Sequence, residues 1–160
     1  MNIGIPKERR PYEYRVGLSP AGVEILYQLG NTCYVEHDAG VGAGFSDQEY
    51  ERLGARIVYS PDEVFRRADL LLKVARPIRE EIDWLQPGSI LAGFLHLASA
   101  RADKIDLIIN KKITAIAYEQ IQLPDGSLPV LRPFSQIGGS MAAQIAARFL
   151  QNNWGGKGIL

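Results

Sequence analysis

The sequence predicts an α/β domain with a doubly wound, mostly parallel sheet and helices on both faces. Short apolar runs alternate with segments of helical periodicity along the 160 residues. Several runs are continuously apolar, for example Leu70-Leu71-Leu72 and Ile90-Leu91-Ala92. Continuous apolar strands are buried on both faces, which is typical of a parallel sheet covered by helices.

Six apolar runs are expected to form the strands. In chain order they are Asn2–Ile5, Thr32–Glu36, Ala55–Tyr59, Leu70–Val74, Ser89–His96 and Ile113–Tyr118. Helix-period segments between them make repeated βα units, as in Rossmann-like and flavodoxin-like domains.

Local signals place the first three helices. Ser19-Pro20 supplies an N-cap and a first-turn proline for a helix that ends at Gly30. Ser46 is expected to cap a short helix over Asp47–Leu53. Ser60-Pro61-Asp62-Glu63 predicts a capping box with proline at the first helical position.

Apolar stripes place two later helices. One runs from about Ala102 to Lys111, and the other runs from about Gln136 to Gln151. The Gly138-Gly139 pair in the last helix indicates close packing or a ligand. Between the two helices, Leu123–Pro129 carries an Asp-Gly turn signal between prolines and is expected to be irregular.

Composition and charge exclude several classes of protein. The 18 basic and 18 acidic side chains give a formal net charge of zero, so no long-range attraction to nucleic acid or anionic membranes is expected. No stretch has the length of a membrane span, and the N-terminus lacks a signal-peptide pattern. Cys33 is the only cysteine and is expected in the core. A cytoplasmic protein is therefore expected.

Polar side chains end three of the predicted strands. Lys73 lies at the end of one strand, His96 ends the next, and Glu119 follows the last. Ligands of open α/β sheets bind beyond the carboxyl ends of the strands, so Lys73 and His96 are expected to face one crevice. The alternatives are a lysine that reaches solvent, a structural histidine, and a helix-capping or solvated glutamate.

Arg15 adds an anion-binding group to this set. It lies in the long segment after the first strand, and a planar guanidinium grips a carboxylate with two hydrogen bonds. An Arg, a Lys and a His suit a small keto or amino acid: Arg15 binds the carboxylate, Lys73 polarises the carbonyl or imine, and His96 moves protons.

Several blocks of the sequence resemble alanine dehydrogenases and transhydrogenase alpha subunits, in order and over nearly the whole chain. They are Ile3–Glu8, Arg15–Val23, Ala39–Asp47, Leu72-Lys73-Val74 with Pro77, Leu95-His96-Leu97-Ala98, Ala115–Glu119 and Asp125–Pro129. The His96 block is similar to alanine dehydrogenases, whereas transhydrogenases usually differ at this histidine.

The resemblance implies roles for individual residues. Arg15 and Lys73 would hold the carboxylate and carbonyl of pyruvate, and His96 would be the acid/base group. The implied reaction is the reversible oxidative deamination of L-alanine to pyruvate and ammonia, with hydride passed to NAD. Ser135 would be a contact to the cofactor. No metal is expected.

The sequence departs from the family pattern at several positions. Ala75-Arg76 replaces a common Lys-Glu pair, and Phe94 replaces a frequent Tyr in the substrate pocket. Phe134, Gln136 and Ser140 stand where Met, Glu and Arg are common. These changes leave Arg15, Lys73 and His96 in place but affect the choice of substrate.

The resemblance also implies a domain organisation. Residues 1–132 would form the substrate domain, and residues 133–160 a connecting helix and the start of a truncated NAD-binding domain, with Ile159-Leu160 opening a strand. NAD would be bound mainly by the missing part, so the chain alone should be inactive. The full-length parent would form a homo-oligomer.

Two other functions compete with this one. A transhydrogenase alpha domain would couple hydride transfer to a membrane partner. A non-catalytic α/β module would bind a small acid or only a partner protein.

Overall fold

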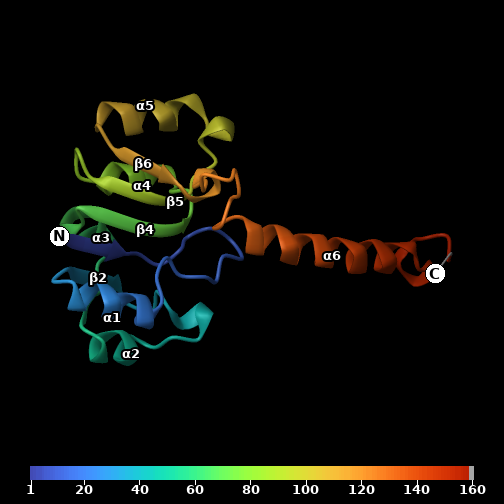
Figure 1. The fold of residues 1–160 in the computed structure, drawn as a ribbon, viewed down its shortest axis with the longest axis horizontal. Coiled ribbons are helices and arrows are strands. Elements are labelled where there is room, and N and C mark those ends of the chain that lie inside the picture. Colours follow the sequence, from blue (N-terminus) through green and yellow to red (C-terminus); the bar gives the residue numbers. More distant parts are fainter. Residues whose placement is uncertain (159–160) are drawn as a thin grey trace. The chain divides into compact units, whose positions relative to one another are not determined.

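The computed structural model describes residues 1–158 and confirms the predicted fold class. Six parallel strands form one sheet in the order β3-β2-β1-β4-β5-β6 (Figure 1). The strands are β1 Asn2–Ile5, β2 Thr32–Glu36, β3 Ala55–Val58, β4 Leu70–Ala75, β5 Ile90–Phe94 and β6 Thr114–Ala117. The strand predicted at Ile159-Leu160 lies outside the described residues.

Helices follow the strands as predicted, with one addition. They are α1 Pro20–Gln28, α2 Asp47–Arg52, α3 Pro61–Arg67, α4 Arg79–Trp84, α5 Ala102–Asn110 and α6 Arg132–Leu150, and short 3₁₀ turns include η1 Val41–Ala43, η2 Leu97–Ser99 and η3 Tyr118–Gln120. Helix α4 was not predicted, because its six residues are too few to show an apolar period. Helix α6 begins four residues before the expected Gln136.

Two of the three predicted caps form as expected. The Ser19 and Ser46 hydroxyls accept from the backbone N–H groups of Gly22 and Glu49, and Glu49 completes a capping box at Ser46. The capping box predicted at Ser60 is wrong. The Ser60 hydroxyl donates to the Asp62 carboxylate instead of accepting from the helix backbone.

The core consists of two clusters on opposite faces of the sheet. Side chains alternate along each strand, so Tyr34 packs with the Val64 and Phe65 side chains of α3, whereas Cys33 and Val35 pack on the other face. Helices α1 and α2 contribute Val23 and Tyr50 to the second cluster. Cys33 is fully buried as expected, and burial raises the pKa of its thiol.

The chain divides into two compact units, one over Met1–Tyr118 and one from Glu119 onward. The first unit contains the whole sheet and helices α1 to α5, and the second contains α6. The predicted functional boundary after residue 132 stays a prediction. No helix among residues 1–158 is long and apolar enough to cross a membrane.

The sheet reverses its winding between β1 and β4. These strands are neighbours, yet β1 is followed along the chain by β2 on one side, and β4 by β5 on the other. The carboxyl ends of two such strands are the usual place of a ligand crevice in an open α/β sheet. The β1–α1 loop (residues 6–19) and the residues after β4 meet there.

Gly17 brings the β1–α1 loop against β4. A Cβ atom at this position would lie 2.2 Å from the carbonyl oxygen of Leu72. That oxygen belongs to the backbone of a central strand, so the loop rather than the strand would have to move. Only glycine allows this close approach.

We therefore expect Gly17→Ala to lower the free energy of unfolding by about 1–3 kcal/mol, as overpacking does. Urea denaturation followed by circular dichroism measures this. Gly138→Ala is the matched control, because a Cβ there meets no heavy atom within 4 Å. A Gly17→Ala chain as stable as the parent would contradict the close approach.

Candidate ligand site at the switch point of the sheet

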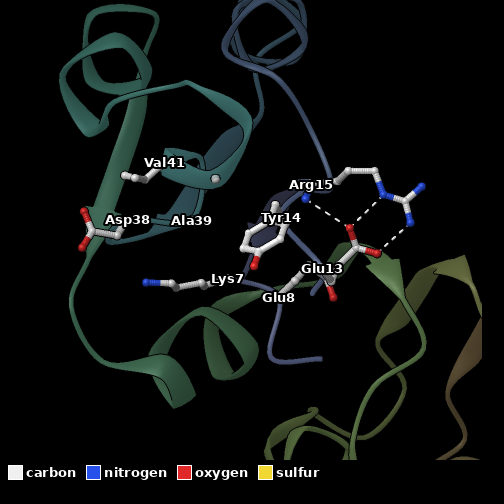
Figure 2. A pocket seen from close by; sticks show the side chains of 9 residues that line it. Lys7, Glu8, Glu13, Tyr14, Arg15, Asp38, Ala39 and Val41 are labelled. Atoms are coloured by element: carbon white, nitrogen blue, oxygen red, sulfur yellow. Dashed lines mark hydrogen bonds and ion pairs between the residues drawn. The ribbon is translucent and has the colours of Figure 1, made fainter. Parts of the chain in front are cut away.

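Two adjoining cavities lie at the carboxyl ends of the strands, and Arg15 lines both. The first cavity has a volume of about 330 Å³ and is lined by Lys7, Glu8, Glu13, Tyr14, Arg15, Asp38, Ala39, Val41 and Gly42 (Figure 2). The second has a volume of about 210 Å³ and is lined by Arg10, Arg15, Val74, Ala75, Arg76, Phe94, His96 and Ser99. The structure thus brings Arg15 and His96 to the same cavity.

Arg15 already grips a carboxylate. Its Nε donates to Glu13 Oε1 at 2.8 Å and its Nη2 to Glu13 Oε2 at 2.6 Å (Figure 2). The side-chain hydrogen bonds to Arg15 hold the pKa of the Glu13 carboxyl below its ordinary value, and those to Glu13 raise the pKa of Arg15. This two-bond grip is the geometry with which an arginine binds the carboxylate of a small acid.

His96 occupies a constrained position just beyond β5. Its φ of 45° lies in the left-handed region, which non-glycine residues rarely adopt. The residue directs the chain from the strand into the turn η2, and its ring stacks on Phe94 with centroids 6.4 Å apart. The predicted strand therefore extends two residues too far at its carboxyl end, and the imidazole lies just beyond the observed end.

Lys73 does not face the same crevice as His96, although the sequence predicted that it would. Its side chain is 1% exposed, and its Nζ is 2.8 Å from Glu81 Oε1 and 3.2 Å from Glu8 Oε2. Lys73 lines neither of the two cavities. The alternative of a lysine that reaches solvent does not hold, and its predicted contact to a substrate would require the pairs with Glu8 and Glu81 to open.

The Lys73 pairs belong to a larger buried network. Arg9 Nη1 is 3.4 Å from Glu81 Oε1, and Arg9 Nη2 donates to Glu36 Oε1 at 2.7 Å. Glu8 Oε1 also accepts the backbone N–H of Val74 at 2.6 Å. The network therefore ties the β1–α1 loop to β2, β4 and α4.

Sequence reasoning missed four members of this network, namely Glu8, Arg9, Glu36 and Glu81. Glu8 lies in the block Ile3–Glu8 that resembles the family, and no role was predicted for it. A signal did exist for a partner, because a lysine within an apolar strand needs an opposite charge nearby. The sequence did not indicate which carboxylate it would be, since Glu81 belongs to the unpredicted helix α4.

The other two candidate residues lie in the second unit. Ser135 is exposed in the first turn of α6, where its backbone N–H donates to the Leu131 carbonyl oxygen. Glu119 lies in the turn η3. The role of Ser135 as a cofactor contact stays a prediction.

One group of side chains has the make-up of a cation site. His37, Asp38 and Asp47 bring their ligand atoms within 4.8 Å of one another. Asp47 accepts the Asp38 backbone N–H at 3.0 Å and bonds the His37 ring at 2.5 Å, so it fixes the turn between β2 and η1. These bonds account for the cluster, and the cluster carries no metal assignment.

Comparisons with known proteins agree over the whole chain. Residues 4–138 match the model of the family described as "Alanine dehydrogenase/PNT, N-terminal domain". The chain is 43% identical to an alanine dehydrogenase of Methanococcus maripaludis and 45% identical to one of Geobacillus stearothermophilus, each over 100% of this chain. It spans 43% of the length of each of these relatives.

Solved structures give the same result. An L-alanine dehydrogenase structure superposes with a TM-score of 0.89 at 44% identity, covering 100% of this chain and 44% of that one. A transhydrogenase from Sinorhizobium meliloti gives a TM-score of 0.69 at 33% identity, covering 74% of this chain and 35% of that one.

The buried lysine generates a stability prediction. Lys73→Met should cost about 3–5 kcal/mol, because it leaves Glu8 and Glu81 buried without their shared cation. Urea denaturation of the purified chain measures this. The control is the triple variant with Glu8→Gln and Glu81→Gln, which removes the uncompensated charges and should recover part of the loss. A single variant within 1 kcal/mol of the parent would show that the pairs do not stabilise the fold.

Proposed function

The chain belongs to the alanine dehydrogenase/PNT N-terminal domain family, and from this premise we propose that it supplies the substrate-binding half of an NAD-dependent alanine dehydrogenase. The reaction is the reversible conversion of L-alanine, NAD⁺ and water to pyruvate, ammonium, NADH and a proton. The placement of Arg15 and His96 on one cavity at the switch point is the observation that supports it best.

Arg15 binds the carboxylate of the substrate in this proposal. Its Nε and Nη2 hold the Glu13 carboxylate in the structure, so the same two donors are already oriented for a carboxylate ligand. The substrate carboxylate takes the place of Glu13, which remains at the edge of the first cavity. The exchange keeps the guanidinium paired throughout.

His96 handles protons at the reacting carbon. In the deamination direction, hydride leaves the Cα of alanine, water adds to the resulting iminium carbon, and ammonia departs as the carbonyl forms. An imidazole has an ordinary pKa near neutrality, so it can take a proton from the attacking water and return one to the departing amine. Stacking on Phe94 and the left-handed backbone fix its position at the cavity.

NAD supplies the hydride acceptor in this reaction. Within residues 1–158 the glycine-rich segment Gly40–Gly44 forms the 3₁₀ turn η1 and not the start of an α-helix. It therefore does not fit the phosphate-binding turn of a dinucleotide domain. We propose that the cofactor is held mainly by the part that the longer relatives have and this chain does not span. Ser135 would be the contact that this chain contributes.

Lys73 is a positioning residue in this proposal and does not contact the substrate. Its pairs with Glu8 and Glu81 hold the β1–α1 loop, and thereby Arg15, against the end of β4. A direct contact between Lys73 and the substrate oxygen remains the alternative predicted from the sequence, and it requires the network to open on binding.

The competing functions have less support. The transhydrogenase structure matches less of this chain than the alanine dehydrogenase structure does, and His96 belongs to the alanine dehydrogenase type of block. A non-catalytic binding module would not need a histidine beside the arginine. We further propose that the full-length protein is a cytoplasmic homo-oligomer with a small-molecule substrate.

Pyruvate binding tests this function directly. We expect pyruvate to shift the His96 ring signals in NMR spectra of the labelled chain, with saturation. The chain has two histidines, and His37 bonds to Asp47 outside both cavities, so its signals serve as an internal reference. Arg15→Gln should abolish the shifts, whereas Glu13→Gln should raise the affinity about two- to fivefold, which is the strength of an exposed ion pair.

The outcomes separate clearly. Saturable His96 shifts that depend on Arg15 support a preformed substrate half. Absence of shifts in a chain that circular dichroism shows to be folded would contradict the proposed carboxylate site.

We also expect that the 160-residue chain does not oxidise L-alanine by itself, because its described residues lack a dinucleotide-binding turn. Formation of NADH from L-alanine and NAD, followed by absorbance, measures this. A preparation of a full-length relative is the positive control. Clear alanine oxidation that cofractionates with the purified chain would contradict the expectation.

A further inference from the structure

The second cavity is more basic than a monocarboxylate substrate requires. Its lining includes three arginines, Arg10, Arg15 and Arg76, beside His96, and it includes no aspartate or glutamate among the described residues. Pyruvate and alanine each carry one carboxylate, which Arg15 suffices to bind. Arg10 and Arg76 are therefore surplus to the proposed reaction.

Arg76 is held at the cavity by its neighbours. Its Nη1 donates to the Ser99 carbonyl oxygen at 3.3 Å and to Ser99 Oγ at 3.2 Å. Ser99 Oγ in turn donates to the His96 carbonyl oxygen at 3.0 Å. The guanidinium is thus tied to the same turn that carries the imidazole, and its Nε and Nη2 take no part in these bonds.

Arg10 is tied to Arg76 through the backbone. Its Nε donates to the Arg76 carbonyl oxygen at 3.1 Å, so both arginines belong to one hydrogen-bonded group at the end of β4. The terminal nitrogens of Arg10 do not take part in this bond. Two partly buried guanidinium groups consequently face one small cavity from two segments of the chain.

These two arginines differ from their neighbours in their pairing. Arg9, Arg15 and Arg79 each form an ion pair with a carboxylate. Arg10 and Arg76 form no ion pair with any of residues 1–158. Two like charges close together at a half-buried cavity repel one another and favour an anion between them.

Ala75 leaves room for that anion. It ends β4 and lines the same cavity, and its methyl group is the only side-chain atom that this position places there. A longer side chain at position 75 would fill part of the volume between Arg15 and Arg76. The cavity therefore accepts a ligand that extends past the Arg15 subsite.

We propose that the substrate at this site carries a second carboxylate, which Arg10 and Arg76 bind, so that dicarboxylic 2-oxo and 2-amino acids are preferred to pyruvate and alanine. This inference rests on the roles of Arg15 and His96 in the proposed function, because these residues must bind the 2-oxo acid end of the same molecule. It changes the preferred substrate of that reaction from alanine and pyruvate to dicarboxylic acids. Arg76 is then the residue that determines specificity.

Matched ligands test the second carboxylate in isolation. Isothermal titration of the folded chain at low salt compares 2-oxoglutarate with 2-oxopentanoate, which has the same carbon chain and a methyl group in place of the distal carboxylate. Pyruvate is titrated in parallel. We expect 2-oxoglutarate to bind at least about tenfold more tightly than the other two acids, in line with charge-assisted pairing to arginine.

Variants assign the preference to the two arginines. Arg76→Gln and Arg10→Gln should each reduce the preference for 2-oxoglutarate several-fold and leave pyruvate binding within about twofold. Arg66→Gln is the control, because it removes the same charge from α3, where Arg66 lines a different cavity at the opposite end of the sheet. It should leave all affinities unchanged.

Each result has a definite meaning. Equal binding of 2-oxoglutarate and 2-oxopentanoate would overturn the second-carboxylate inference and leave the proposed function intact, provided pyruvate still shifts His96. A preference for 2-oxoglutarate that survives both Arg76→Gln and Arg10→Gln would place the second carboxylate elsewhere and also overturn it. No binding of any 2-oxo acid to the folded chain would overturn both proposals.

Discussion

The buried ion network around Lys73 is the constraint on which the rest of the site depends. One ammonium group, 1% exposed, joins Glu8 of the β1–α1 loop to Glu81 of α4. The fourteen residues between β1 and α1 belong to no helix or strand, so the position of this loop depends on such ties and on the close approach of Gly17 to Leu72. Because Arg15 lies only two residues before Gly17, the guanidinium that binds a carboxylate is placed by contacts beneath the site.

The direction of the Lys73 side chain follows from strand geometry. Side chains alternate along β4, and Leu71 packs in the cluster that α3 and α4 cover, so Lys73 falls on that same face and meets Glu81. The pairing of β4 with β5 shifts register between Leu72 and Ala75, which pairs Ala75 with Phe94. Val74 and Ala75, at the end of the strand, line the same cavity as Phe94 and His96. The strand thus supplies a buried cation for the scaffold, and Arg76, the residue that follows it, supplies a basic group at the cavity.

The sequence was sufficient for the sheet but not for the pairings within the site. Strands β1 and β2 begin and end where predicted, because continuous apolar runs bounded by turn residues leave little choice. The structure places Arg15 in the segment after β1, as expected, and His96 two residues beyond β5 instead of at its last residue. The ion pairs of Lys73 were not predictable from the sequence. One partner, Glu8, lies 65 residues before it, and the other, Glu81, lies eight residues after it on a helix without a sequence signal. The local capping signal at Ser60 failed because a closer partner competed, since the Ser60 hydroxyl donates to Asp62.

The pairing of Arg15 with Glu13 decides where binding energy can be gained. A substrate carboxylate that replaces Glu13 exchanges one two-bond ion pair for another, so the exchange at Arg15 itself contributes little net affinity. It does impose a requirement, because only a group that offers the same two oxygens can leave Arg15 satisfied. Additional affinity for a dicarboxylic acid would then come from groups that form no ion pair before the ligand arrives, and Arg10 and Arg76 are such groups among the described residues. Recognition of a 2-oxo acid at Arg15 and discrimination between acids at Arg76 are therefore separate tasks of neighbouring guanidinium groups, and the second depends on the first because both groups bind one molecule.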